Sequence, residues 1–303
     1  MGKRIKETSK SLNWKFRFIL MKSIHNERSF FPSLDEIRAK SVSSFVDRLK
    51  IYLSEDAKQG YLFSTVSLFS LIEKEEPNFY IHLVSFLRKN ANSNDPFLLY
   101  LNGVSFNVEQ NIDLEKSFSF FHKSAKLHFV RSIYNLAICY HKGEGVSQNQ
   151  REAAKLYKVA VNANHPEAIF NLAICYENGE GIEKNQREAI RLYKLGKRMG
   201  HPNAIFNLGV CYEKGEGVEK NYQEAANLYS IASAFHDLRA TVKLFIFYLK
   251  GIGIERNLSN AVSYLQIAAD FNYVPSFVIY GLFLLNGIFT DKNEKKAIEL
   301  IKR

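Results

Sequence analysis

The chain has 303 residues, of which 46% are hydrophobic and 24% charged, as expected for a protein with a buried core. Its 41 Lys and Arg residues exceed its 31 Asp and Glu residues, and the formal net charge of +10 makes nucleic acid or an acidic membrane a candidate partner. Three cysteines are too few for a disulfide framework, and no apolar stretch reaches the roughly 20 residues of a membrane-spanning helix. We therefore expect a cytoplasmic protein with reduced thiols.

The first 28 residues carry much of the charge excess, with eight basic and two acidic residues and thus a net charge of +6. Their apolar residues fall on one helical face, and a basic amphipathic helix is typical of docking to nucleic acid, an acidic membrane surface or a protein. The same arm also fits a cap over the open end of a repeat array, or an organelle import signal. The candidate binding residues of this arm are Lys10, Trp14, Lys15, Arg17, Phe18 and Lys22.

Residues 29–95 are predicted to form a helical N-terminal region. An amphipathic helix is expected before Leu53, since apolar residues recur at helical spacing from Ile37 onward. Residues 60–95 fit a degenerate copy of the repeat described next, with helices near 61–72 and 79–87.

Beyond residue 96 the chain repeats itself every 36 residues, a period typical of solenoids. The same offset joins three residues each of Cys, Leu, Tyr, Gly, Asn and Ala, beginning with Cys139, Cys175 and Cys211. The pattern weakens toward both ends of the chain. The predicted units are 96–131, 132–167, 168–203, 204–239, 240–275 and a partial unit 276–303.

Each unit is predicted to be a helix–loop–helix. Ala168, Leu172 and Cys175 share one helical face, and Gly179 provides the left-handed residue that ends a helix. Asn185, followed three residues later by a glutamate, is a capping box that begins the second helix. Because a 36-residue unit cannot bury its apolar face alone, we predict an all-α, right-handed α-solenoid of stacked repeats.

The unit Ala168–Ile182, read together with Asn185 and Tyr193, resembles the Sel-1-like repeat (SLR) family of tetratricopeptide-like solenoids. The unit Ala204–Val218 is similar to the same pattern. The resemblance implies adaptor proteins that hold partners together in larger assemblies. One secreted subgroup of that family pairs two cysteines within each repeat; this chain has one cysteine per repeat, so those disulfides are not expected.

The glycine, cysteine and histidine motifs could suggest phosphate binding, metal binding or catalysis, but we expect each of them to have a structural role. The Gly-Glu-Gly triplets that begin at Gly143, Gly179 and Gly215 follow helices, whereas phosphate-binding glycine loops follow strands. Repeat-equivalent cysteines should lie about 10 Å apart, too far for a disulfide or one shared zinc ion, so we expect core packing. The histidines lack metal-ligand spacing and are expected in turns or at the surface: His122, His128, His141, His165 and His201. We expect no catalytic site, metal or cofactor.

Asn135, Asn171 and Asn207 form a further row with one amide per repeat, next to the core leucine of each first helix. If this row lies on the concave side, its amides would hydrogen-bond the backbone of an extended peptide. Alternatively, the amides solvate that face or brace a neighbouring helix.

The sequence therefore predicts a non-enzymatic adaptor or scaffold that binds a protein partner within a larger complex. The alternative is a nucleic-acid-associated, ribonucleoprotein component that binds phosphate through the basic arm.

Overall fold

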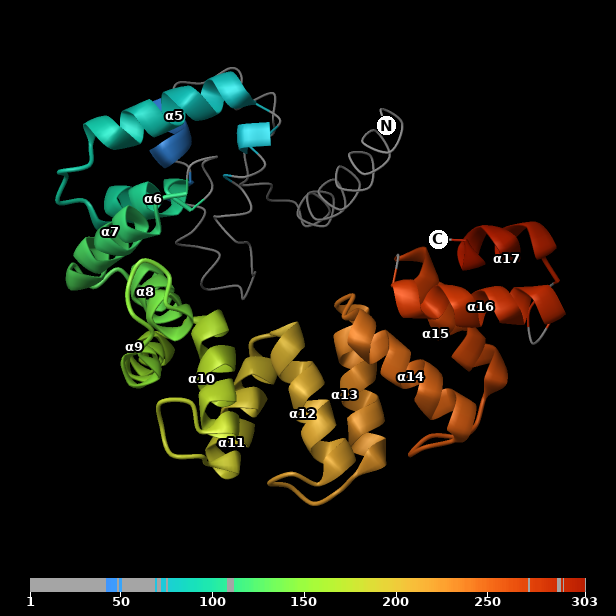
Figure 1. Cartoon of the computed structure of the whole chain (residues 1–303). Coiled ribbons are helices and arrows are strands. Elements are labelled where there is room, and N and C mark those ends of the chain that lie inside the picture. Colours follow the sequence, from blue (N-terminus) through green and yellow to red (C-terminus); the bar gives the residue numbers. More distant parts are fainter. Residues whose placement is uncertain are drawn as a thin grey trace.

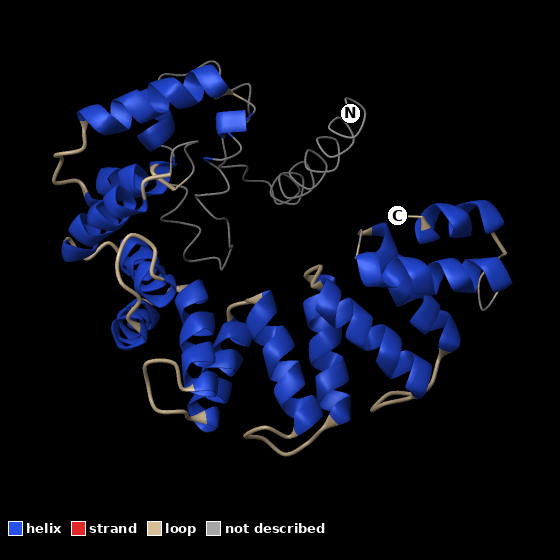
Figure 2. Cartoon of the chain, in the orientation of Figure 1, coloured by secondary structure: helices blue, strands red, loops and turns tan. Residues whose placement is uncertain are grey.

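The computed structural model describes residues 42–47, 49–50, 69, 72–74, 76–107, 112–271, 273–287, 290 and 292–302. Throughout these ranges the regular elements are helices (Figure 2). The basic arm, residues 1–28, lies outside the described residues, as does most of the first helix expected in the degenerate repeat. Phe45, Val46 and Leu49 of the helix predicted before Leu53 are helical and buried.

Beyond residue 95 the helices form pairs in which two roles alternate, and α5 (Pro77–Lys89) directly precedes these pairs. The first helices of the pairs are α6 (Pro96–Ser105), α8 (Val130–Lys142), α10 (Pro166–Asn178), α12 (Pro202–Lys214), α14 (Leu238–Lys250) and α16 (Val274–Asn286). The second helices are α7 (Leu114–Lys126), α9 (Gln150–Asn162), α11 (Gln186–Arg198), α13 (Tyr222–Ala234), α15 (Leu258–Asp270) and α17 (Glu294–Ile301).

Both ends of each pair have a local cause. Gly179 ends α10 with φ 81°, a conformation that glycine adopts without steric cost. The Asn185 side chain begins α11 by accepting a hydrogen bond from the Glu188 N–H at 3.1 Å, as the capping box predicts. In a complete capping box the Glu188 side chain would accept a hydrogen bond from the Asn185 N–H. Here the Asn185 N–H donates to the Tyr176 carbonyl at 2.8 Å instead, and this bond joins α11 to α10.

The second glycine of each Gly-x-Gly loop permits close contact between repeats. Gly181 has φ 69°, and a Cβ placed there would lie 2.0 Å from the Gln150 carbonyl oxygen. A side chain at this position would push the loop away from the first turn of α9. The glycine pair therefore sets both the end of α10 and the spacing of successive repeats.

The pairs stack one after another around an open arc, with each helix packed against its neighbours in sequence (Figure 1). A central core joins residues from Ile133 to Phe247, and further cores cover the two ends of the described chain. The one-per-repeat tyrosines Tyr157, Tyr193 and Tyr229 are buried in the central core. The predicted α-solenoid is thus confirmed.

Candidate functional site

Each first helix has one side that the core covers only in part, and we call the resulting surface the first-helix face. In three consecutive repeats it presents an aromatic ring, an amide, an aliphatic side chain and a polar side chain, all partly exposed. Its residues are Tyr134, Asn135, Ile138 and His141 on α8, Phe170, Asn171, Ile174 and Glu177 on α10, and Phe206, Asn207, Val210 and Glu213 on α12.

The amides of this face partly brace the solenoid. Asn171 donates to the Tyr134 hydroxyl at 3.3 Å, and Asn207 donates to the Tyr193 hydroxyl at 3.1 Å. Both bonds join consecutive repeats, as the bracing alternative predicts. The Asn207 amide keeps a second N–H and its carbonyl oxygen for other partners. Peptide binding by Asn135, Asn171 and Asn207 stays a prediction.

Two glutamates occupy the next turn of the face and accept hydrogen bonds from core tyrosines. The Tyr193 hydroxyl donates to Glu177 at 2.6 Å, and the Tyr229 hydroxyl donates to Glu213. Burial raises the pKa of both tyrosines, so the hydroxyls stay protonated donors. Glu213 also pairs with the Lys243 ammonium at 2.9 Å. The charge of Glu213 is thus neutralised locally by Lys243.

The composition of the face changes toward the C-terminal end. The amide position becomes Lys243 on α14 and Ile279 on α16. Val278, Ile279 and Leu282 are 52%, 40% and 46% exposed, so α16 ends the face with a cluster of aliphatic side chains. The sequence analysis did not predict this cluster. Its signal in the sequence is Ile279, which occupies the position that asparagine holds in three earlier repeats.

Two of the histidines expected in turns or at the surface lie in turns but are buried. His165 and His201 do lie in turns, as the residues that precede α10 and α12, but they are 8% and 3% exposed. Their rings stack on Tyr134 and Phe170, with centroids 4.5 and 5.2 Å apart. Burial lowers the pKa of His165 to about 3 and that of His201 to about 4, so both rings are neutral at pH 7.

The cysteines behave as expected, since Cys139, Cys175 and Cys211 are free and buried. Burial raises the pKa of each thiol to about 12. One of them has neighbours that sequence reasoning did not bring together: ligand atoms of His141, Cys175 and Glu180 all lie within 4.8 Å of one another. The three residues come from two repeats, so no local spacing marks them.

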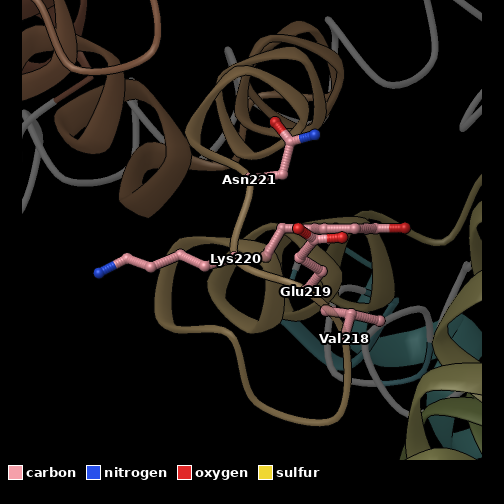
Figure 3. A pocket seen from close by; sticks show the side chains of 5 residues that line it. Val218, Glu219, Lys220 and Asn221 are labelled. Carbon is pink, nitrogen blue, oxygen red and sulfur yellow. The ribbon is translucent and has the colours of Figure 1, made fainter.

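A pocket of about 410 Å³ lies beside the loop between α12 and α13. Its lining residues are Tyr212, Val218, Glu219, Lys220 and Asn221. The Lys220 side chain points away from the other labelled side chains (Figure 3), and its ammonium lies 4.7 Å from the Tyr222 ring centroid. Asn221 already caps α13. Asn221 in this pocket therefore has a structural role.

The remaining predicted site residues lie outside the described residues, namely Lys10, Trp14, Lys15, Arg17, Phe18 and Lys22. Within the described ranges, no helix combines the length and apolar character needed to cross a membrane.

Comparison with known proteins identifies the repeat. The sequence pattern of the Sel1 repeat matches residues 98–129, 130–165, 166–201, 202–234, 238–270 and 279–303. Protein SHC1 of Saccharomyces cerevisiae is 28% identical over 154 residues, which cover 50% of this chain and 25% of the yeast protein. DAP3-binding cell death enhancer 1 of Rattus norvegicus is 37% identical over 84 residues, which cover 27% of this chain and 16% of the rat protein. The match thus spans a quarter or less of these relatives.

Solved structures show the same fold. A Sel1 repeat protein from Oxalobacter formigenes superposes with a TM-score of 0.65 at 23% identity, covering 79% of this chain and 96% of that one. A protective antigen of uropathogenic Escherichia coli with an SLR fold gives 0.66 at 24% identity, covering 72% of this chain and 47% of that one.

Proposed function

The chain belongs to the Sel1 repeat family, and from this premise we propose that it is a non-enzymatic adaptor that binds a protein partner on its first-helix face. Sel1 repeat proteins generally mediate protein–protein interactions, and the family is typically a scaffold without catalytic activity. The rat relative is named for binding another protein, DAP3, which agrees with this role.

The observation that carries the proposal is the change in side-chain polarity along the first-helix face. On α10 and α12 the face has one amide and one carboxylate beside its apolar side chains, whereas three exposed aliphatic side chains end the face at α16. Exposed apolar clusters with polar surroundings mark binding surfaces. A fitting partner segment carries backbone or polar groups toward α10 and an aliphatic anchor toward α16.

Two matched pairs of variants test this role once affinity purification and mass spectrometry have named a partner. Calorimetry with the purified full chain then measures the dissociation constant. Leu282→Asp should weaken binding at least about tenfold, since a charge replaces a buried interface side chain. Ile267→Asp is the control, because Ile267 is 42% exposed on a second helix and so lies off the proposed surface. Equal effects of the two variants, or none from Leu282→Asp, contradict the proposal.

The second pair separates binding by the amides from bracing. Asn207→Ala and Tyr193→Phe both remove the hydrogen bond between these side chains, but only the first removes the amide from the face. We expect Asn207→Ala to weaken partner binding and Tyr193→Phe to leave it unchanged. A loss shared by both variants would assign Asn207 a structural role.

A second candidate function follows from the +6 charge of residues 1–28, which suits phosphate binding by a ribonucleoprotein component. Phosphate binding to a single strand weakens with salt by a log–log slope of about −0.7 per neutralised phosphate. Deletion of residues 1–28 should abolish RNA binding under this alternative. The adaptor proposal expects the deletion to leave partner affinity unchanged.

We place the adaptor in the cytoplasm, with organellar import through the basic N-terminus as the alternative. The support for a reducing compartment is that Cys139, Cys175 and Cys211 are all free. Fluorescence microscopy of the full chain and of a chain without residues 1–28 distinguishes the two compartments.

A further inference from the structure

Three side chains with different donor atoms meet where two repeats join. His141 lies in the last turn of α8, Cys175 lies on α10, and Glu180 follows the glycine that ends α10. Their imidazole nitrogen, thiol sulfur and carboxylate oxygen all lie within 4.8 Å of one another. Elsewhere in the described part of the chain, no other three His, Cys, Asp or Glu side chains come this close.

Two buried polar atoms at this junction lack a hydrogen-bond partner among the described residues. They are His141 Nδ1 and the Gln150 side-chain oxygen. The two residues are adjacent, since the Gln150 amide donates to the His141 carbonyl at 3.2 Å. His141 Nδ1 lies 3.9 Å from Glu180 Oε2, too long for a direct hydrogen bond. Unsatisfied buried groups are uncommon, and one explanation for them is a bound ion.

The carboxylate is already oriented toward the histidine. Glu180 Oε1 accepts a hydrogen bond from the Asn178 amide at 2.7 Å, which leaves Oε2 facing His141. Hydrogen bonds of this kind hold metal ligands in place. The His141 and Glu180 side chains are 33% and 32% exposed, whereas Cys175 is 1% exposed, so an ion can enter from the solvent side.

The next repeats show what is special about His141. Its equivalents are Glu177 and Glu213, and each of these accepts a hydrogen bond from a core tyrosine. At the first junction the Tyr157 ring centroid lies 6.3 Å from the His141 ring. The histidine thus replaces an acceptor that the repeat pattern uses for bracing, and it supplies a nitrogen ligand beside Cys175.

We propose that His141, Cys175 and Glu180 bind one Zn²⁺ ion that joins the repeats containing α8 and α10. Imidazole, thiolate and carboxylate are the ligand types of zinc, and three of them leave a fourth position for water. Binding releases the Cys175 thiol proton to solvent, and the resulting thiolate and carboxylate balance the charge of the ion. Tetrahedral coordination needs ligand atoms about 3 to 4 Å apart, so side-chain movements of about 1 Å complete the site.

Cobalt titration of the full chain, free of any affinity tag, tests the site directly, because Co²⁺ takes zinc positions and reports thiolate ligands. We expect one equivalent of Co²⁺ to produce a thiolate-to-metal charge-transfer band and tetrahedral visible bands, and Zn²⁺ to displace them. Cys175→Ala should abolish the band, and His141→Gln should weaken affinity at least about tenfold. Cys211→Ala is the matched control, because it removes the equivalent buried thiol one repeat further on.

Thermal unfolding followed by circular dichroism gives a second readout that also checks folding. Without metal, Cys175→Ala and Cys211→Ala should lower the melting temperature by similar amounts. Zn²⁺ should raise the melting temperature of the wild type and of Cys211→Ala only, because ligand binding to the folded state stabilises it. The proposal is overturned by a missing charge-transfer band, by a band that persists in Cys175→Ala, or by an equal loss in Cys211→Ala.

Discussion

The burial of His201 at the start of α12 predicts a loss of stability in mild acid. The ring is 3% exposed, stacks on Phe170, and accepts a hydrogen bond from the Ala204 N–H at 3.4 Å through Nδ1. An imidazolium has no lone pair for this bond, so the folded chain requires the neutral ring. Burial accordingly lowers the pKa of His201 from 6.5 to about 4.

The magnitude follows from the difference in proton binding between the unfolded and folded chains. At pH 8, well above 6.5, neither state carries the proton to a significant extent, and the stability is fully present. As the pH falls through 6.5 toward 4 the unfolded chain takes up the proton while the folded chain does not, so the free energy of unfolding decreases. At about 1.4 kcal/mol per pH unit, His201 costs the protein about 2 kcal/mol at pH 5 relative to pH 8.

His201→Asn isolates this contribution, because asparagine also caps helices but does not titrate. Urea unfolding of the wild type and the variant, followed by far-UV circular dichroism, gives their free-energy difference at each pH, and other titrating groups cancel in that difference. We expect the variant to gain about 2 kcal/mol on the wild type between pH 8 and pH 5. His128→Asn is the control, since His128 is exposed at φ 60°, which asparagine tolerates. A difference for His201→Asn that stays constant over this range would refute the reasoning.

Three further stability predictions use the same unfolding assay. Gly181→Ala should lower the free energy of unfolding by at least about 3 kcal/mol, since the new Cβ meets the Gln150 carbonyl oxygen at 2.0 Å. Gly200→Ala has a similar φ of 71° but no close backbone contact, so it should lower this free energy by only about 1 kcal/mol. Equal losses in the two variants would contradict the contact argument. Asn221→Ala should cost about 1 kcal/mol through the lost helix cap, and Asn221→Ser should restore most of it. Tyr193→Phe should cost about 1 to 2 kcal/mol, because it leaves the partly buried Glu177 and Asn207 without their shared hydroxyl, and an unchanged stability would show that water replaces that hydroxyl.

The repeat and the ends of its helices can be predicted from the sequence because they depend on local interactions. Gly215 ends α12 and Asn221 begins α13 through interactions within a few residues, so their spacing alone predicts both helices. Cys211 is buried because its place on the helical stripe is fixed by the same period. These features recur in the three central repeats, which makes the period a reliable guide to the solenoid.

The site depends instead on how one repeat lies against the next, which the period does not give. Tyr193 reaches Glu177 sixteen residues earlier and Asn207 fourteen residues later, and no local pattern joins these three side chains. His201 is buried because the aromatic ring of Phe170, on α10 and 31 residues earlier in the chain, covers it. A histidine before a helix fits an exposed turn equally well when the sequence is read alone.

The departures from the repeat therefore carry more functional information than the repeat itself. Identical units stacked in one direction present the same surface at every step, so a uniform face would let a partner bind in several registers. The amide position of the face is held three times by asparagine, then by Lys243 and then by Ile279, while the carboxylate position begins with His141. A partner with one polar and one aliphatic end finds a single register on such a face, because shifting it by one repeat would place an apolar side chain against Lys243. Ile279→Asn would replace the aliphatic end of the face by a fourth amide and weaken this discrimination, so calorimetry should show weaker partner binding by the variant although the fold keeps its repeat pattern.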